Sequence, residues 1–165
     1  MEHVIASYLR QVWDKNDWLY EGQHGFRPGY SCESQVICKD IADSLDNGDR
    51  IDPIIIYFSK AFDLVPHGRL LTKIANSGVD SGVVVWIREF LLGRTQRVRV
   101  GGDLSEEVRV TSGVPQESLL GPHLFLAYVN DISRIIESII RLFADDGVIY
   151  RKIINKGDIG ISRKF

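Results

Sequence analysis

Residues 139–153 read IIRLFADDGVIYRKI, and this stretch decides most of the fold class. Apolar runs at 139–143 and 148–153 flank the tight segment 144–147, which contains a glycine. Runs of this length around such a turn predict a β-hairpin. Its tip carries two adjacent carboxylates, Asp145 and Asp146, which repel each other unless a cation lies between them. An Asp-Gly pair is also ordinary turn chemistry, so these two residues alone do not establish a metal site.

The elements before the hairpin are both helical and extended. The run IIIYF at 54–58 follows Pro53 and predicts a short buried strand, since it is too short for a helix. Helical spacing of apolar residues or capping residues predict helices near 4–12, 31–48, 70–78, 81–92 and 118–131, and alternation predicts a second hairpin over 97–110. This order has no strict βαβ alternation, so we expect an α+β fold with a mainly antiparallel sheet.

Composition limits the class of protein. The 165 residues are 44% hydrophobic and 25% charged, which is typical of a globular domain. Twenty basic against 22 acidic residues give a net charge of -2, which argues mildly against a dedicated nucleic-acid binder. Only Cys32 and Cys38 are cysteines, and they predict free thiols. The sequence shows neither a signal peptide nor an apolar run of membrane-spanning length, so we expect an intracellular protein, nuclear or cytoplasmic.

Two further segments give the hairpin a context. Residues 57–63 read YFSKAFD at the end of the predicted strand, and residues 112–122 read SGVPQESLLGP before a predicted helix. In this order, with FADD at 143–146, the segments resemble the reverse transcriptases of non-LTR (LINE-type) retrotransposons, which carry DFSKAFD, SGVPQGS and FADD. The family's QHGFR, PH and GRxQRV also match, at 23–27, 66–67 and 93–98. The resemblance covers roughly residues 10–155, and several ordered motifs make it specific.

The resemblance implies an architecture. We expect a partial fingers and palm of a right-hand polymerase, with a mainly antiparallel palm sheet packed on helices. Residues of about 1–50 would be fingers-like, 51–155 palm-like and 156–165 a frayed tail in a single partial domain. On the same comparison we expect the thumb and endonuclease of the family to be absent, and the resemblance leaves the oligomeric state open.

The resemblance also implies a chemistry. Family members join nucleotides on an RNA template and a DNA primer, with two Mg²⁺ ions held by three carboxylates. It places Asp145 and Asp146 on the hairpin as metal-binding catalytic residues. It places Phe62 below the sugar, Gln116 against the nucleotide or template, and Arg27 near nucleic acid or triphosphate. Phe62 is equally well explained as a packed core residue.

Four features depart from the family. Tyr57 stands where the family has the strand aspartate, and a tyrosine phenol is neutral at pH 7 and a poor magnesium ligand. Asp63 lies six residues further on, where the family has a second aspartate, so we do not expect it to substitute. Glu117 replaces a glycine and adds a charge beside a polyphosphate. Tyr30 replaces a residue that is often basic. The length is the fourth departure.

Three hypotheses follow. The first is a remnant of a retrotransposon RNA-directed DNA polymerase that keeps part of the fold and lacks polymerase activity, with Mg²⁺ and template-primer binding weakened or lost. The second is a polymerase that is active within a larger assembly, which requires Tyr57 to be tolerated. The third is a non-enzymatic module on a palm-like scaffold that binds nucleic acid or protein, because a fold does not fix a function.

Overall fold

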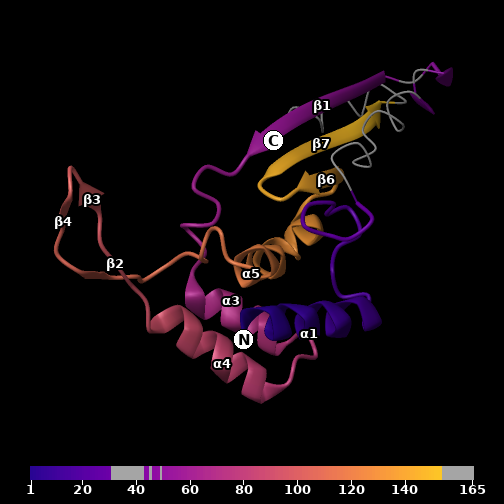
Figure 1. Ribbon diagram of the computed structural model, residues 1–165. Coiled ribbons are helices and arrows are strands. Elements are labelled where there is room, and N and C mark those ends of the chain that lie inside the picture. Colours follow the sequence, from indigo (N-terminus) through magenta and orange to yellow (C-terminus); the bar gives the residue numbers. More distant parts are fainter. Residues whose placement is uncertain (31–42, 45, 49, 154–165) are drawn as a thin grey trace. The chain divides into compact units, whose positions relative to one another are not determined.

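The chain forms two compact units, each with its own apolar core. The computed structural model describes residues 1–30, 43–44, 46–48 and 50–153 (Figure 1). One unit combines Met1–Leu19 with Lys60–Val129 and is referred to here as the helical unit. The other combines Tyr20–Ser59 with Asn130–Phe165 and is the sheet unit. The predicted helix over 31–48 lies largely outside the described residues, as do Cys32, Cys38 and the predicted tail.

The helical unit contains α1 (Glu2–Lys15), α3 (His67–Ala75), α4 (Ser81–Leu92) and α5 (Leu120–Val129). Helix α3 packs on both α4 and α5, and α1 packs on α5. The bounds of α4 agree with the prediction because Asp80, whose carboxylate accepts from the Gly82 amide at 2.8 Å, caps its start. Helix α3 begins at His67, directly after Pro66, earlier than its apolar stripe indicates.

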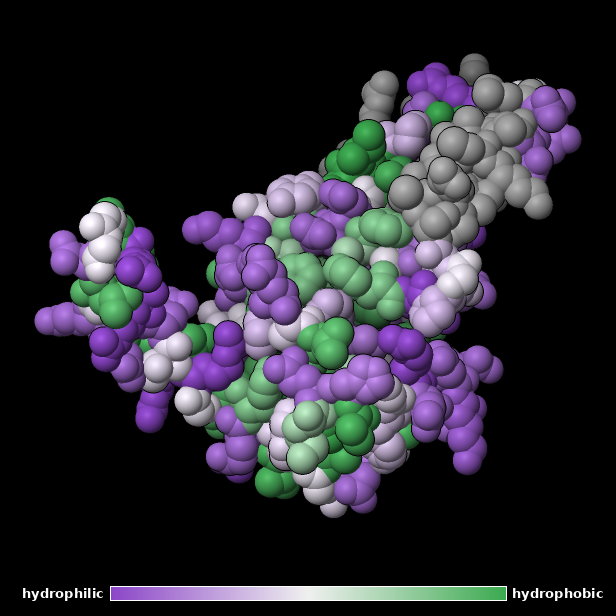
Figure 2. Space-filling model, in the orientation of Figure 1, coloured by the Kyte–Doolittle hydropathy of each residue, from purple (hydrophilic) through white to green (hydrophobic). Residues whose placement is uncertain are grey.

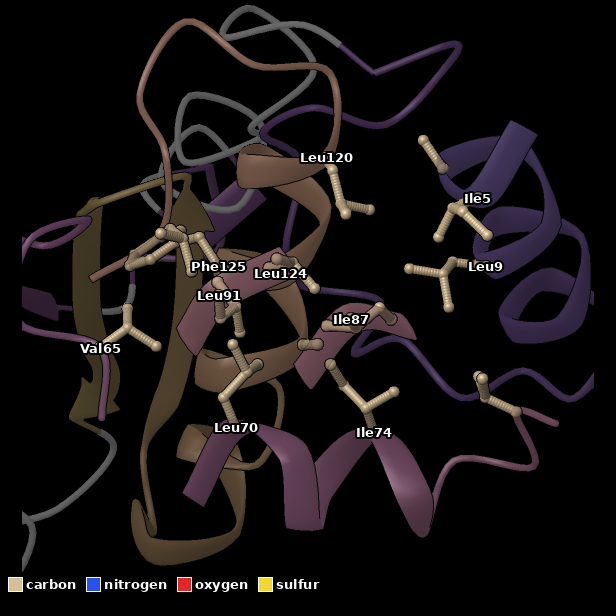
Figure 3. Close-up of a cluster of buried hydrophobic side chains, with 14 of the residues drawn as sticks. Ile5, Leu9, Val65, Leu70, Ile74, Ile87, Leu91, Leu120, Leu124 and Phe125 are labelled. Atoms are coloured by element: carbon tan, nitrogen blue, oxygen red, sulfur yellow. The ribbon is translucent and has the colours of Figure 1, made fainter. Parts of the chain in front are cut away.

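A single apolar core joins the four helices of this unit. Figure 3 shows side chains converging from all four, among them Leu9, Leu70, Ile74, Ile87, Leu91 and Leu124, which are all fully buried. Trp13 is also fully buried, and its indole N–H donates to Ser77 Oγ at 2.9 Å. A buried tryptophan needs such a partner for its one polar group. The same hydroxyl donates to Ile74 O at 2.7 Å, so Ser77 joins α1 to the end of α3.

Helix α5 begins later than predicted, at Leu120 rather than Ser118, and ends at Val129. Pro122 lies in its first turn, where a missing N–H breaks no helical hydrogen bond. The Ser118 hydroxyl accepts from the Gly121 amide at 2.8 Å and donates to Pro115 O at 3.1 Å. These two bonds connect the preceding loop to the helix start.

A hairpin extends from α4 and returns before α5. Strands β2 (Thr95–Gln96) and β5 (Val108–Arg109) pair at its base, and β3 (Arg99–Val100) and β4 (Asp103–Leu104) pair at its tip (Figure 1). The ladders are shorter than the predicted alternation. The turn at Gly101 and Gly102 has φ of 59° and 103°, which glycine adopts without strain.

The hairpin carries exposed apolar side chains. Val98, Val100, Leu104 and Val108 are all more than half exposed. Figure 2 shows hydrophobic surface on the hairpin among hydrophilic side chains. Two short ladders without a covered apolar face are marginally stable by themselves.

The sheet unit is built on three antiparallel strands in the order β1-β7-β6. Strand β1 spans Arg50–Tyr57, β6 spans Ile139–Phe143 and β7 spans Asp146–Ile153, and a 3-10 turn, η1 (Ile132–Ile135), precedes β6. Ile149 lies between Ile54 and Ile140, and together these residues belong to the core on one face of the sheet. The expected α+β class with antiparallel pairing is confirmed.

The strand predicted at residues 54–58 is present as part of β1, but the prediction that it is buried is wrong. Strand β1 is at the edge of the sheet, which explains why it includes Pro53. Ile55 is 81% exposed and Tyr57 is 68% exposed, whereas Ile54 and Ile56 pack in the core. An uninterrupted apolar run cannot distinguish a strand covered on both faces from one covered on a single face.

Among the helices that the structure describes, none combines the length and apolar character needed to cross a bilayer.

The pH dependence of stability should depend in part on His123. Its Nδ1 donates to Leu119 O at 3.0 Å, which leaves Nε2 to accept from the Arg10 guanidinium at 3.2 Å. Burial lowers the pKa of His123 below its ordinary value of 6.5, and the Arg10 charge adds to this despite the opposing bond to Leu119. A histidine with a lowered pKa binds more protons when unfolded, so its contribution to stability is present above pH 6.5 and is lost as the pH falls below it.

We therefore expect His123→Gln to flatten the acid side of the unfolding free energy, measured by urea denaturation at several pH values. His3→Gln, at an exposed histidine, serves as the control for the substitution itself. An unaltered slope in His123→Gln would contradict the assignment.

Close packing at the start of α5 leaves no room at Gly121. A β carbon there would lie 1.9 Å from Pro115 O. Gly121→Ala should lower the unfolding free energy by at least about 2 kcal/mol, because the loop or helix has to move. Gly68→Ala in α3, where a β carbon meets nothing within 4 Å, should be neutral or stabilise by up to about 1 kcal/mol. Equal effects of the two alanines in denaturant melts would refute the packing argument.

Candidate functional site

The end of β1 lies beside the carboxylate hairpin. In the register of the sheet Tyr57 is directly opposite Asp146, which in turn is opposite Phe143. Directly opposite residues of an antiparallel pair project from the same face, so these three side chains form one row across the sheet. Tyr57 and Asp146 are both exposed on that face. The residue at position 57 is therefore the cross-strand neighbour of a hairpin carboxylate.

The hairpin turn is tighter than predicted. Strand β7 begins at Asp146, so the turn consists of Ala144 and Asp145 alone. Ala144 has φ of 56°, a positive value at the first of the two turn positions. The Phe58 amide donates to Asp145 O at 3.0 Å, so the chain leaving β1 is attached to the turn. Asp145 is half-buried and Asp146 is exposed.

The oxygen donors around this turn are two carboxylates and a phenol, and magnesium prefers charged oxygen ligands. Two adjacent carboxylates are suitable oxygen ligands for one hard cation. Tyr57 lies across the sheet from Asp146, and its phenol is a poor ligand for Mg²⁺. In the described part of the chain no three His, Cys, Asp or Glu side chains come together in a way that could hold a metal ion. The residues present therefore do not fit a two-ion centre.

The segment 22–24 is hydrogen-bonded to strand β6 of the hairpin. The Leu142 amide donates to Gly22 O and the His24 amide to Leu142 O, both at 2.8 Å. Gln23 is 3% exposed and its side chain bonds to the backbone of Ala144. Sequence reasoning used Gln23 only as part of a motif and assigned it no role. A buried glutamine cannot be distinguished from an exposed one by residue type.

Arg27 is engaged within its own loop. Its guanidinium donates to Tyr20 O at 3.2 Å and Gln23 O at 3.4 Å, and lies 4.7 Å from the centre of the Tyr30 ring. Tyr30 also packs edge-on against His24 at 4.9 Å. The residue that departs from the family pattern at position 30 thus contributes to holding Arg27. A role for Arg27 toward a triphosphate stays a prediction.

In the helical unit, two motifs about fifty residues apart are joined by backbone bonds. The Val114 amide donates to Phe62 O and the Gly113 amide to Val65 O, both at 2.8 Å. Gly113 has φ of 90°, and a β carbon there would lie 2.8 Å from Asp63 O. The ring of His67 bonds to Gly113 O through Nε2 at 2.8 Å. These contacts hold the loop 112–116 on the turn 62–67.

Phe62 belongs to the turn and Gln116 to the loop that these bonds join. Phe62 is half-buried and stacks on Phe125 with ring centres 4.6 Å apart, as the core-packing explanation requires. Gln116 is exposed, and its Nε2 donates to Asp63 Oδ1 at 3.0 Å. A groove of about 620 Å³ runs from Asp63 and Gln116 toward the hairpin residues Arg94 and Arg109.

Glu117 occupies backbone geometry that favours glycine. Its φ is 57°, in the left-handed region where a side chain costs about 1–2 kcal/mol. The family glycine at this position would adopt it without strain. Glutamate at position 117 therefore has a conformational cost in addition to the effect of its charge.

The predicted site residues divide between the two units. Tyr57, Asp145, Asp146 and Arg27 belong to the sheet unit, whereas Phe62 and Gln116 belong to the helical unit. Within the sheet unit, Tyr57 meets Asp146. Within the helical unit, Gln116 meets Asp63 rather than Phe62.

Comparisons with known proteins agree with these motifs. A family model described as reverse transcriptase (RNA-dependent DNA polymerase) matches residues 1–161. The chain therefore belongs to the reverse transcriptase family. Among individual proteins it is similar to three RNA-directed DNA polymerases of Drosophila melanogaster mobile elements, so the resemblance to LINE-type non-LTR retrotransposons is confirmed.

These relatives are much longer than the chain. The probable polymerase of transposon X-element is 30% identical over 152 residues, which are 88% of this chain and 17% of the relative. That of transposon BS is 31% identical over 133 residues, 79% of this chain and 15% of the relative. The polymerase of mobile element jockey is 28% identical over 134 residues, 80% of this chain and 14% of the relative. The chain thus spans less than a fifth of each.

Removing the side chain at position 117 should stabilise the fold. We expect Glu117→Gly to raise the unfolding free energy by about 1 kcal/mol, because glycine adopts a positive φ without a steric penalty. Glu117→Ala is the matched control: it removes the charge but keeps the β carbon, and should change stability by less than about 0.5 kcal/mol. Equal gains for the two variants in thermal melts would point to charge rather than conformation.

Proposed function

We propose that this chain is a remnant of the fingers and palm of a retrotransposon RNA-directed DNA polymerase and lacks polymerase activity. The observation that carries the proposal is the position of Tyr57, directly across the sheet from Asp146. The missing strand carboxylate belongs at that position. The loss therefore falls on the metal-binding carboxylates themselves, not on a peripheral residue.

The chemistry explains why one side chain is enough. Nucleotidyl transfer by this family uses two divalent ions, which activate the primer hydroxyl and stabilise the leaving pyrophosphate. Asp145 and Asp146 would supply oxygen ligands for one ion. A neutral phenol at position 57 supplies no charge to bridge a second one, and its ring occupies space next to Asp146. Stabilisation of transition-state charge is the largest catalytic contribution in such sites, so its loss removes most of the rate.

The helical unit supports the same proposal. In the helical unit, Phe62 and Gln116 are the residues we assign to the nucleotide, with RNA template and DNA primer as the ancestral partners. In the sheet unit, Arg27 is a separate assignment, toward nucleic acid or triphosphate. Gln116 is bonded to Asp63, and Glu117 adds a negative charge beside it. A carboxylate next to a polyphosphate weakens its binding. Binding of nucleotide and template-primer is therefore reduced together with catalysis.

A second candidate is a non-enzymatic nucleic-acid-binding module. It is supported by the groove that Arg94 and Arg109 line together with Gln96 and Ser112. Arginine and small polar side chains are typical phosphate contacts. Binding of RNA–DNA duplex that weakens steeply with salt, in a chain that extends no primer, distinguishes this function from the first.

The test adds back the carboxylate. We expect no magnesium-dependent primer extension on an RNA template from the unaltered chain. Tyr57→Asp should raise the affinity for Mn²⁺, measured by electron paramagnetic resonance, about tenfold or more, because a third carboxylate joins the pair. Tyr57→Asn, equally small but uncharged, is the control and should not. Tyr57→Asp combined with Glu117→Gly is the variant in which extension is expected to reappear.

Each outcome has a separate meaning. Extension by the unaltered chain would refute the proposal. Stronger Mn²⁺ binding by Tyr57→Asp without extension would support the role of position 57 in metal binding. The remaining defect would then be in the binding of duplex or nucleotide. Equal Mn²⁺ binding by the aspartate and asparagine variants would show that position 57 does not face the metal.

A further inference from the structure

The outer edge of β6 is occupied by the segment that contains Gln23. Strand β6 is the last strand in the order β1-β7-β6, and β7 pairs with only one of its edges. Gln23 forms a parallel bridge with Leu142 on the other edge, through the two 2.8 Å bonds to Gly22 and from His24. This short pairing places the Gln23 side chain beside the turn that follows β6.

The Gln23 side chain forms hydrogen bonds with both polar backbone groups of Ala144, its N–H and its C=O. Its Oε1 accepts from the Ala144 amide at 3.0 Å and from the Gly25 amide at 2.9 Å. Its Nε2 donates to Ala144 O at 3.3 Å. The partners fix the orientation of the amide, since two N–H groups require an oxygen and a carbonyl requires a nitrogen. One buried side chain therefore meets both polar groups of a single turn residue.

That turn residue is strained. Ala144 is buried and has φ of 56°, a conformation that costs an L-residue about 1–2 kcal/mol and persists only where the surroundings enforce it. The surroundings are close here: a β carbon at Gly25 would lie 2.2 Å from the Ala144 amide nitrogen. Gln23 and Gly25 therefore both lie directly against the backbone of Ala144.

The type of side chain matters at this position. Glutamine offers one oxygen that can accept two bonds and one nitrogen that donates, and it has no charge. A lysine or arginine would donate but would also compete with a cation for Asp145 and Asp146. A glutamate could not donate to Ala144 O and would add to the repulsion between the two carboxylates.

We propose that Gln23 is a positioning residue for the carboxylate hairpin. It holds Ala144 in the left-handed conformation and so sets the direction in which the chain presents Asp145 and Asp146. The inference rests on the proposed function in one respect only, that Asp145 and Asp146 would bind a metal ion once a carboxylate is restored at position 57. The geometry of the turn does not depend on that assumption.

The first measurement needs no metal. We expect the Ala144 and Gly25 amides of the unaltered chain to exchange with solvent as slowly as the amide of Ile149 in β7, measured by NMR. Gln23→Met, which keeps the length of the side chain but loses its hydrogen bonds, should speed exchange at these two amides at least about tenfold more than at Ile149. Fast exchange at Ala144 in the unaltered chain would overturn the inference, even if Gln23→Met does not fold.

The second measurement uses Mn²⁺ and the Tyr57→Asp chain. There Gln23→Met should lower Mn²⁺ affinity about 10- to 100-fold, the usual loss when a residue supporting metal ligands is removed. Adding Ala144→Gly should restore most of it, because glycine needs no clamp to adopt a positive φ. Ile140→Val, a truncation in the core of β6, controls for general loss of stability and should lower the melting temperature without changing Mn²⁺ affinity.

The two proposals fail differently. If Tyr57→Asp binds no more Mn²⁺ than the unaltered chain, the account of position 57 is wrong, and exchange at Ala144 still decides the role of Gln23. If Tyr57→Asp binds Mn²⁺ and a folded Gln23→Met variant binds it equally well, Gln23 does not position the carboxylates. If Ala144→Gly fails to restore the affinity, Gln23 acts through something other than the conformation of Ala144.

Discussion

The register of β7 between β1 and β6 is the constraint on which the sheet unit depends. Ile149 has to meet Ile54 and Ile140 on the core face, and this alignment places Asp146 opposite Tyr57 on the other face. A slip of one residue would exchange the two faces along the whole strand. The same apolar contacts that stabilise the sheet therefore determine which side chain stands beside Asp146, and the pairing accommodates a tyrosine there.

Two L-residues with positive φ illustrate different relations between strain and function. Ala144 is buried and bonded on both sides by Gln23, so its surroundings offset the cost of the turn. Glu117 is exposed and holds its strained conformation at a position where the family has glycine. The first arrangement is typical of a functional turn that the fold maintains. The second is a strained geometry that glycine would adopt without cost.

Sequence reasoning succeeded where the signal was local. The ends of α4 follow from Asp80 and Gly93, and the hairpin at residues 139–153 follows from two apolar runs around a turn. It failed where the signal depended on neighbours. The exposure of Ile55 reflects the coverage of β1 on only one face, and the burial of Gln23 reflects its pairing with Leu142. Neither neighbour is close in the chain, so no local pattern could have indicated them.

By itself, the sequence determined the family and the α+β class, because ordered motifs and residue types can be read without coordinates. Only the tertiary structure decided that Tyr57 is opposite Asp146 in the sheet, that Gln116 is bonded to Asp63 and that Gln23 is bonded to Ala144. Each of these pairs joins residues more than fifty positions apart. Contacts of that kind are selected by the packing of whole strands and loops, which residue type and spacing do not specify.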